Sequence, residues 1–475
     1  MELSSFISIF FVTSKMLDVV KILIILTFTT ILCSQTVYEQ ILYEDDEQLD
    51  IFAYQLPENF DPDFTYPLLI GFHQWGGNHM STFSTTFDEE SNQRNWIFLS
   101  PFGGSVNNYN HQGAQYMVQK AIDWMISNYN INQSRIYMVG GSMGGAAGMI
   151  YANNHLNPEE PMIAATASAS GILDCERRAI EMDGNNSMIE WFGGNYDEVP
   201  FEYHRNSAIY FLDSNQSMHN NLRYIPLYFD FGVSEPHRTH AEEMYEIMLE
   251  YNENMWIEEE PEGSHGFSVF DDVHVCDWLS QFELNDDPDY INVNLDESSR
   301  AYWIEVNNDE QVENEFMKII ALREVYEDSL IINIEETQNI TYNNITLHIM
   351  DDLYDYINLY YNEISPYEYN TIGITGDLID YVSHISVNGC DFCITIEDDI
   401  IWVHIDSENT LLEIFYPSDI NNDGDWNILD ILLTINFIMG EIEPTPEQNF
   451  LADMNQDGLV DILDIIMMVN FILAN

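Results

Sequence analysis

The stretch that decides the fold of the first half of the chain is Ile136-Tyr137-Met138-Val139-Gly140-Gly141-Ser142-Met143-Gly144. Its apolar start, Ile136 to Val139, predicts a buried strand, and the pattern of residues 146–153 predicts a helix directly afterwards. Between them stands the spacing Gly-x-Ser-x-Gly. A sharp turn from strand to helix requires glycine where a Cβ would clash, and it exposes the serine hydroxyl above the sheet. We therefore predict that Ser142 is a nucleophile.

The sequence on both sides of this turn continues the same alternation. From about residue 38 to residue 284, short apolar runs alternate with helical patterns, which is typical of a parallel sheet with crossover helices. The spacing of Met117, Ala121, Trp124 and Met125 predicts a helix over residues 113–129. Further strands are predicted at 66–72, 96–99, 164–168, 226–231 and 255–259, and helices near 241–251 and 273–282. We therefore predict a doubly wound α/β domain over residues 38–284.

A serine nucleophile needs a base, and the base needs an acid that orients it. On scaffolds with a Gly-x-Ser-x-Gly turn the chain order is serine, acid, histidine. His265 follows the last predicted strand and precedes the last helix, so we predict that it is the base. Glu235 follows the strand over 226–231 and is the predicted acid. Asp230 is the alternative acid, but it lies inside that strand.

The charge that develops on the substrate oxygen must be met by preset N–H groups. One is the backbone N–H of Met143, immediately after the serine. The second should come from the turn after the strand over 66–72, where His73-Gln74-Trp75-Gly76-Gly77 stands. Either Gln74 or Trp75 can supply it, and we expect His73 to be structural.

Residues 38–284 resemble the α/β-hydrolases of the secreted esterase and prolyl-oligopeptidase-like group, which includes feruloyl and acetyl-xylan esterases. Phe192-Gly193-Gly194 and the segments that follow it are similar to the part of those enzymes before the acid-bearing strand. Gln74 replaces the first glycine of their His-Gly-x-Gly turn, and Glu235 stands where many relatives carry Asp. The resemblance implies an α/β-hydrolase fold and a Ser142–Glu235–His265 triad that needs no catalytic cofactor.

The period of the apolar pattern changes to two from about residue 287 to residue 416. This alternation predicts a β-rich accessory domain, a sandwich of immunoglobulin type. Asn388-Gly389 between apolar runs predicts a hairpin. No convergent polar set is present, so we interpret the region as a spacer, with carbohydrate binding by its aromatic residues as the alternative.

An internal repeat at the C-terminal end predicts two calcium loops. Ca²⁺ takes six to eight oxygen ligands, and alternating positions on a tight loop point their oxygens inward. The first loop places Asp419, Asn421, Asp423, Gly424, Asp425, Asn427 and Asp430 at positions 1, 3, 5, 6, 7, 9 and 12. The second places Asp453, Asn455, Asp457, Gly458, Leu459, Asp461 and Asp464 at the same positions. We predict one calcium ion in each loop.

These loops differ from EF-hands because position 12 is Asp and because residues 410–416, before the first loop, are expected to be extended. They resemble the type I dockerin module, over residues 417–475. Each loop leads into a helix that is apolar nearly all round, so each must bury part of its surface against something else. The resemblance implies a cohesin partner. Its contact candidates are Ile428, Leu429, Ile462 and Leu463, unless these side chains fill the dockerin core.

The first 34 residues predict an export signal, with Met16 as an alternative start. Lys21 is followed by an apolar run from Ile22 to Leu32, which is too short to span a bilayer. Four cysteines remain after it, and an exported protein can form disulfides. The simplest pairing joins Cys175 to Cys276 and Cys390 to Cys393. Zinc at the last pair is the weaker alternative, because no second ligand pair accompanies it.

The charge of the chain excludes two classes of partner. Its 475 residues carry 81 Asp and Glu against 13 Lys and Arg, a net charge of −68. Such a polyanion has no basic surface for nucleic acid, and an anionic bilayer repels it. With 46% hydrophobic residues the chain can bury a core. The acidity indicates either adaptation to a saline medium or the general acidic drift of secreted proteins.

The sequence therefore predicts a secreted serine hydrolase, an esterase that acts on feruloyl or acetyl esters of polysaccharide and is tethered by a dockerin. One alternative is a prolyl-oligopeptidase-like peptidase or a general carboxylesterase. The other is a non-catalytic, calcium-dependent adhesion or scaffold protein, against which the intact Ser142 and His265 argue.

Overall fold

The structure is a computed structural model of the chain. It describes residues 36–183, 186–308, 314–326, 329–349, 356–361, 370–376, 384–388, 394–397, 400–405, 409–415, 420–421, 427–454 and 458–474. The predicted export signal and the pair Cys390 and Cys393 lie outside these residues. No helix within them is long and apolar enough to cross a bilayer.

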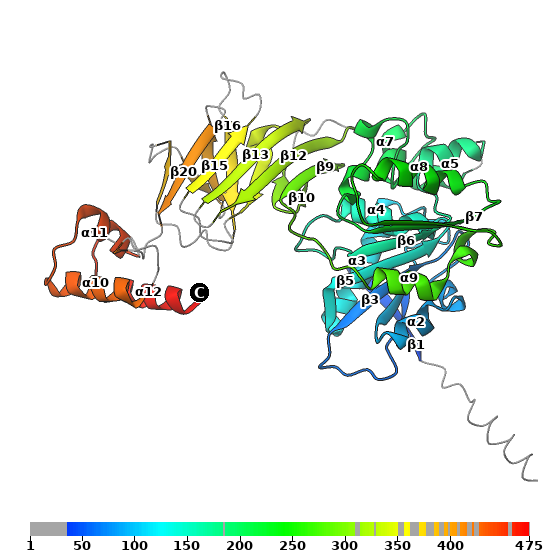
Figure 1. Cartoon of the computed structure of the whole chain (residues 1–475), viewed down its shortest axis with the longest axis horizontal. Helices are drawn as coiled ribbons and strands as arrows, with labels where there is room; N and C mark the ends of the chain where they lie inside the picture. Colours follow the sequence, from blue (N-terminus) through cyan, green and yellow to red (C-terminus); the bar gives the residue numbers. More distant parts are fainter. Residues whose placement is uncertain are drawn as a thin grey trace, which may run out of the picture.

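An eight-stranded sheet organises the first half of the chain (Figure 1). Its strands are β1 (Val37–Glu44), β2 (Glu47–Gln55), β3 (Tyr66–Phe72), β4 (Ile97–Pro101), β5 (Ile131–Gly141), β6 (Ala165–Ala169), β7 (Leu227–Gly232) and β8 (Met255–Glu260). Their order is β1-β2-β4-β3-β5-β6-β7-β8. The strand β2 runs antiparallel to both of its neighbours, and from β4 to β8 all neighbours are parallel. This is the α/β-hydrolase fold that the sequence predicts.

Helices cover both faces of this sheet. They are α2 (Phe87–Gln93), α3 (Gln112–Asn128), α4 (Ala147–Asn154), α5 (Cys175–Glu181), α6 (Met188–Phe192), α7 (Pro200–Arg205), α8 (Arg238–Met248) and α9 (Asp272–Leu279). Buried side chains of α3, α4 and α8 share one core with the sheet, and those of α2 and α9 share another. The predicted helices over 113–129, 241–251 and 273–282 correspond to α3, α8 and α9, and are confirmed. The sequence patterns did not reveal the short helices α5, α6 and α7.

Two six-stranded sheets follow and share one buried core. One has the order β10-β11-β14-β16-β19-β18 and the other the order β17-β20-β15-β13-β12-β9. The strands are β9 (Tyr290–Leu295), β10 (Ser299–Ala301), β11 (Ile304–Val306), β12 (Met317–Val325), β13 (Ser329–Gln338), β14 (Ile345–His348), β15 (Tyr356–Tyr361), β16 (Asn370–Thr375), β17 (His384–Val387), β18 (Ile394–Glu397), β19 (Ile400–Ile405) and β20 (Asn409–Phe415). A β-sandwich is therefore confirmed. It differs from the two antiparallel sheets of an immunoglobulin domain, because β13 pairs with β15 and β14 with β16 in parallel.

The predicted hairpin at Asn388-Gly389 is wrong. The strand before it, β17, pairs with β20, whereas the next strand, β18, pairs with β19 in the other sheet. Asn388 instead extends the pairing with β20, because it exchanges hydrogen bonds with Leu411 (2.9 Å each). Gly389 lies outside the described residues. An Asn-Gly turn forms a hairpin only where the flanking strands pair with each other.

The predicted disulfide between Cys175 and Cys276 is also wrong, because both thiols are free and buried. The two residues pack in different apolar clusters, Cys175 beside Met143 and Cys276 within α9. The Cys175 thiol donates to the carbonyl of Asn206 (3.1 Å), and burial raises its pKa to about 12. Pairing of the two cysteines would need the chain to bring these clusters together.

Three helices complete the described chain: α10 (Ile428–Met439), α11 (Pro446–Ala452) and α12 (Ile462–Ala474). They enclose a small core built around Ile420, Phe437, Ala452 and Met468. The segment before them is the strand β20, so the extended conformation predicted there is confirmed.

Candidate active site

The predicted nucleophile lies on a strained turn between β5 and α4. Ser142 has φ +57°, in the left-handed region that favours glycine. The turn brings the two outer residues of Gly-x-Ser-x-Gly together, because a Cβ on Gly140 would lie 2.1 Å from the carbonyl oxygen of Gly144. Hydrogen bonds from the Ser142 N–H to the Ala169 carbonyl (2.8 Å) and from the Gly145 N–H to the Ser142 carbonyl (2.9 Å) fix the strained residue. The serine side chain is thereby held at the carboxyl edge of the sheet.

His265 joins this serine to Glu235. Its Nε2 lies 2.8 Å from Oγ of Ser142, and its Nδ1 lies 2.7 Å from Oε2 of Glu235. The Glu235 side chain is 1% exposed and that of His265 is 39% exposed. The buried Glu235 carboxyl therefore contacts one side of an accessible imidazole, and the other side of that imidazole contacts the partly exposed hydroxyl of Ser142. The structure brings together the three residues that the sequence placed in this triad.

Asp230, the alternative acid, lies within β7 and is buried. No hydrogen bond joins its carboxyl to His265 in the described structure. Burial, with the nearby charges of Glu258 and Glu260, raises the pKa of Asp230 to about 8. Near neutral pH its carboxyl is largely protonated, so it lacks the charge that would stabilise an imidazolium.

The turn after β3 lies beside the serine and the histidine. Gly76 and Gly77 already donate their N–H groups, to the carbonyls of Val106 (2.7 Å) and Gln74 (2.9 Å). The Gln74 side chain also lies close to the triad, since a Cβ on Gly266, next to His265, would lie 2.1 Å from its Nε2. Trp75 is 59% exposed, and its indole donates to Ser187 Oγ (3.4 Å). The sequence alone predicted a role for the backbone of this turn and did not reveal the position of the Gln74 side-chain amide.

One group near the triad has the residue types of a metal site. Ligand atoms of Glu181, His237 and His240 lie within 4.8 Å of one another. However, Nδ1 of the buried His240 accepts hydrogen bonds from the backbone N–H groups of Leu173 (3.2 Å) and Asp174 (3.3 Å). The proton of the neutral ring must then sit on Nε2, which faces Glu181 (3.7 Å). This proton leaves His240 without a free nitrogen lone pair for a metal ion.

The C-terminal loops are described in part. Asp419, Asp423, Asp425, Asn455 and Asp457 lie outside the described residues. In the second loop Gly458 has φ +85°, and its N–H donates to the Asp453 carboxylate (2.8 Å). The carboxylates at position 12, Asp430 and Asp464, are fully buried and accept backbone N–H groups of their own loops, from Asn427 (2.9 Å) and Asp461 (2.7 Å). The glycine at position 6 thus makes the sharp turn that a calcium loop requires.

Comparison with protein families identifies this part of the chain. The model of the dockerin type I domain matches residues 417–473. Residues 417–473 are a dockerin type I domain. Dockerins of this type bind calcium and bind cohesin modules.

Other comparisons concern the first half of the chain. No curated protein matches the sequence. Among solved structures, the chain is similar to the fluorophosphonate-binding serine hydrolase F of Staphylococcus aureus (15% identity, 52% of this chain and 98% of that chain, TM-score 0.38). It is also similar to a ferulic acid esterase (15% identity, 49% and 91%, TM-score 0.37) and to a truncated carbohydrate esterase from gut microbiota (16% identity, 52% and 95%, TM-score 0.42).

The donor set of the dockerin fits calcium. The described candidates Asn421, Asn427, Asp430, Asp453, Asp461 and Asp464 carry hard carboxylate and amide oxygens, and Leu459 contributes a backbone carbonyl at position 7. The tight turn at Gly458 brings position 1 toward position 6, as such a loop needs. These residues would hold the ions, whose charge would offset the crowded carboxylates.

The dockerin helices leave a large apolar surface uncovered. Ile428 is 66% exposed, Leu429 52%, Ile462 61% and Leu463 51%. The alternative that these four side chains fill the dockerin core is therefore wrong. Their positions at the start of α10 and α12 repeat the internal symmetry of the sequence, and they remain our candidates for cohesin contact.

Proposed function

We propose that the chain is a secreted serine esterase that removes acyl groups from polysaccharide, and that its dockerin tethers it to a cohesin-bearing scaffold. The observation that carries the catalytic part is the continuous hydrogen-bonded series from Glu235 through His265 to Ser142, with spacings of 2.7 and 2.8 Å. Such a series on a strained turn makes a hydroxyl nucleophilic at neutral pH.

The proposed reaction follows from these positions. Oγ of Ser142 attacks the ester carbonyl while Nε2 of His265 takes its proton, and the Glu235 carboxylate stabilises the imidazolium. The oxyanion that forms is bound by the N–H of Met143 and by a donor from Gln74 or Trp75. His265 then protonates the departing alcohol, which leaves an acyl group on Ser142. Water, activated by His265, releases the acid and restores the serine.

A polar cleft between the hydrolase fold and the β-sandwich, lined by none of the triad residues, offers a surface on which the chain of a polysaccharide can bind. The cleft has a volume of about 700 Å³ and begins at the first turn of α3. None of the described residues that line it has a large aliphatic side chain. The lining offers amides, hydroxyls and carboxylates, such as Gln112, Gln119, Asn157, Ser298 and Glu305. Such groups both donate and accept hydrogen bonds, as sugar hydroxyls do.

Hydrogen bonds and an ion pair join the hydrolase fold to the β-sandwich beside this cleft. The Tyr302 N–H donates to the Leu156 carbonyl (2.8 Å), and Arg300 pairs with Glu159 (2.7 Å). Asn221 and Asn294 exchange backbone and side-chain hydrogen bonds of 2.8 and 2.9 Å. The β-sandwich can therefore act as a wall of a binding cleft as well as a spacer.

A panel of substrates tests the proposed function. Acetyl-xylan, methyl ferulate and an aminoacyl anilide should be offered to the wild type and to Ser142→Ala. We expect hydrolysis of one or both esters by the wild type alone. Preference for the anilide would indicate the peptidase alternative. Absence of any hydrolysis, together with a Ser142 that does not react with a fluorophosphonate, would indicate the non-catalytic alternative.

A further inference from the structure

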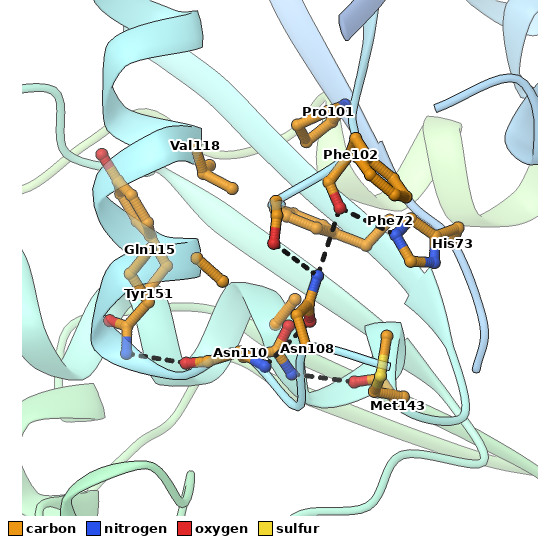
Figure 2. A pocket seen from close by; sticks show the side chains of 13 residues that line it. Phe72, His73, Pro101, Phe102, Asn108, Asn110, Gln115, Val118, Met143 and Tyr151 are labelled. Atoms are coloured by element: carbon orange, nitrogen blue, oxygen red, sulfur yellow. Dashed lines mark hydrogen bonds between the residues drawn. The ribbon is translucent and has the colours of Figure 1, made fainter. Parts of the chain in front are cut away.

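A loop that the sequence patterns did not single out, residues 102–111, lies against Met143. The Asn110 side-chain amide donates to the Met143 carbonyl (2.9 Å), and the Tyr109 N–H donates to the Met143 sulfur (3.3 Å). Figure 2 shows Asn110 between Gln115 and Met143, with a hydrogen bond to each. Met143 is 2% exposed, so both its backbone and its side chain are held in a closed environment.

The loop is strained where it makes these contacts. Tyr109 has φ +45° and Asn110 has φ +55°, two consecutive non-glycine residues in the left-handed region. Such strain persists only where the surrounding structure fixes it. Here the Asn108 amide donates to the carbonyls of Phe102, Gly103 and Ser105 (3.1–3.2 Å), while its oxygen accepts from the Asn110 N–H (3.0 Å). Both strained residues are buried, so their conformation is set by contacts with the protein.

Two side-chain amides, those of Asn154 and Gln115, connect the loop over residues 102–111 to α4 through hydrogen bonds. Asn154, at the end of α4, donates to the Gln115 side-chain oxygen (2.9 Å), and Gln115 donates to the Asn110 carbonyl (2.9 Å). The adjoining cavity has a volume of about 20 Å³, room for about one water molecule.

We propose that Asn110 is a positioning residue for the N–H of Met143 that binds the oxyanion. This inference rests on the proposed function, because that N–H matters only if Ser142 attacks a carbonyl. Met143 has φ −51° and ψ −49°, and the hydrogen bonds to its carbonyl and sulfur fix both angles and the side chain. A preset donor must be aligned within about 0.5 Å and 10–20° of the productive geometry. Release of Met143 should therefore weaken transition-state binding more than substrate binding.

Asn110→Gly is the cleanest test, because glycine accepts φ +55° and only the amide is removed. Asn95→Gly is the matched control: Asn95 has φ +60° and lies before the start of β4, at the sheet edge opposite Ser142. The kcat for methyl ferulate or p-nitrophenyl acetate should be expressed per serine titrated with a fluorophosphonate. For Asn110→Gly we expect kcat to fall about 10- to 100-fold with KM within threefold. Affinity for a boronic acid that mimics the tetrahedral intermediate should fall by a similar factor.

The control separates positioning from a general loss of stability. Asn95→Gly should keep kcat and boronate affinity within twofold of the wild type. If Asn110→Gly leaves too few reactive serines to titrate, Asn110→Asp keeps the shape and removes the donor, and the same loss of kcat is expected. A kcat per reactive serine within twofold of the wild type in the Asn110 variant would overturn the inference. A wild type that hydrolyses no ester would instead overturn the proposed function itself.

Discussion

Nδ1 of His265 lies 2.7 Å from the carboxylate of Glu235, a residue of the loop that follows β7. Asp230, inside that strand, has no hydrogen bond with the histidine in the described structure, and its raised pKa keeps it largely neutral. A strand residue is held with its neighbours in the sheet, whereas the loop after the strand can turn its side chain toward the histidine. The acid of the triad therefore lies in the loop, where the side chain is not fixed by strand pairing.

Separate substitution of each candidate acid by its amide distinguishes their roles. Glu235→Gln should lower kcat by about two to four orders of magnitude, because the amide cannot stabilise the imidazolium. Asp230→Asn should retain kcat within about threefold. Steady-state hydrolysis of p-nitrophenyl acetate by both variants measures this. A near-normal Glu235→Gln beside an inactive Asp230→Asn would reverse our assignment.

The raised pKa of Asp230 predicts a pH-dependent effect on stability. The folded pKa, about 8, exceeds the usual value near 4, so folding takes up a proton between these pH values. The contribution of Asp230 therefore becomes less favourable as pH rises through this window. Asp230→Asn cannot ionise, so its Tm should exceed that of the wild type by a few °C at pH 8, and the difference should shrink toward pH 4. Calorimetric scans across this range test it, and a difference independent of pH would contradict it.

Substitution in the polar cleft should affect large substrates selectively. Gln112→Ala combined with Gln119→Ala removes two amides that line the cleft on α3. We expect KM for acetyl-xylan to rise about 5- to 30-fold, because each of the two lost hydrogen bonds contributes about 0.5–1 kcal/mol. The kcat/KM for p-nitrophenyl acetate should change less than twofold. Gln93→Ala, on α2 across the sheet, is the control. Equal losses on both substrates would show that the cleft does not bind the polymer.

Calcium should control folding of the dockerin and leave the hydrolase unchanged. Each loop gathers four aspartates within twelve residues, and only a cation offsets their mutual repulsion. The core of the module is also too small to fold without such support. In the full chain, chelation should remove helical signal in circular dichroism and expose α10 and α12 to protease, with esterase activity retained. Asp464→Asn should weaken calcium binding in a calorimetric titration. Unchanged helix content in excess chelator would show that the loops do not fold this module.

Salt should stabilise the chain. The net charge of −68 repels itself, and NaCl screens this repulsion within about 8–10 Å at physiological ionic strength. The Tm of the calcium-loaded protein should rise by several °C from low salt to the strength of seawater. An uncharged osmolyte at equal osmolarity controls for nonspecific effects. A flat or falling Tm would remove the saline interpretation of the composition.

Local geometry explains what the sequence by itself determined. Close approach of Gly140 and Gly144 fixes the turn at Ser142, and spacing within short loops places the calcium candidates. Both features depend on residues a few positions apart, so residue type and spacing contain the required information. The alternation of apolar runs likewise predicted the parallel sheet, because period and burial are local properties of strands and helices.

Only the tertiary structure decided relationships between distant residues. His265 and Ser142 are 123 positions apart, and their contact depends on how β5 and the loop after β8 meet at one sheet edge. Tertiary packing also places Cys175 and Cys276 in different apolar clusters. It pairs β18, the strand that follows Asn388, with a strand of the other sheet, and it brings Asn110 into contact with Met143. The run Asn107-Asn108-Tyr109-Asn110 offered a signal for the last, since asparagine tolerates positive φ, but its target is set by the surrounding fold. Burial and pairing are properties of the whole packed molecule, and residue spacing alone does not determine them.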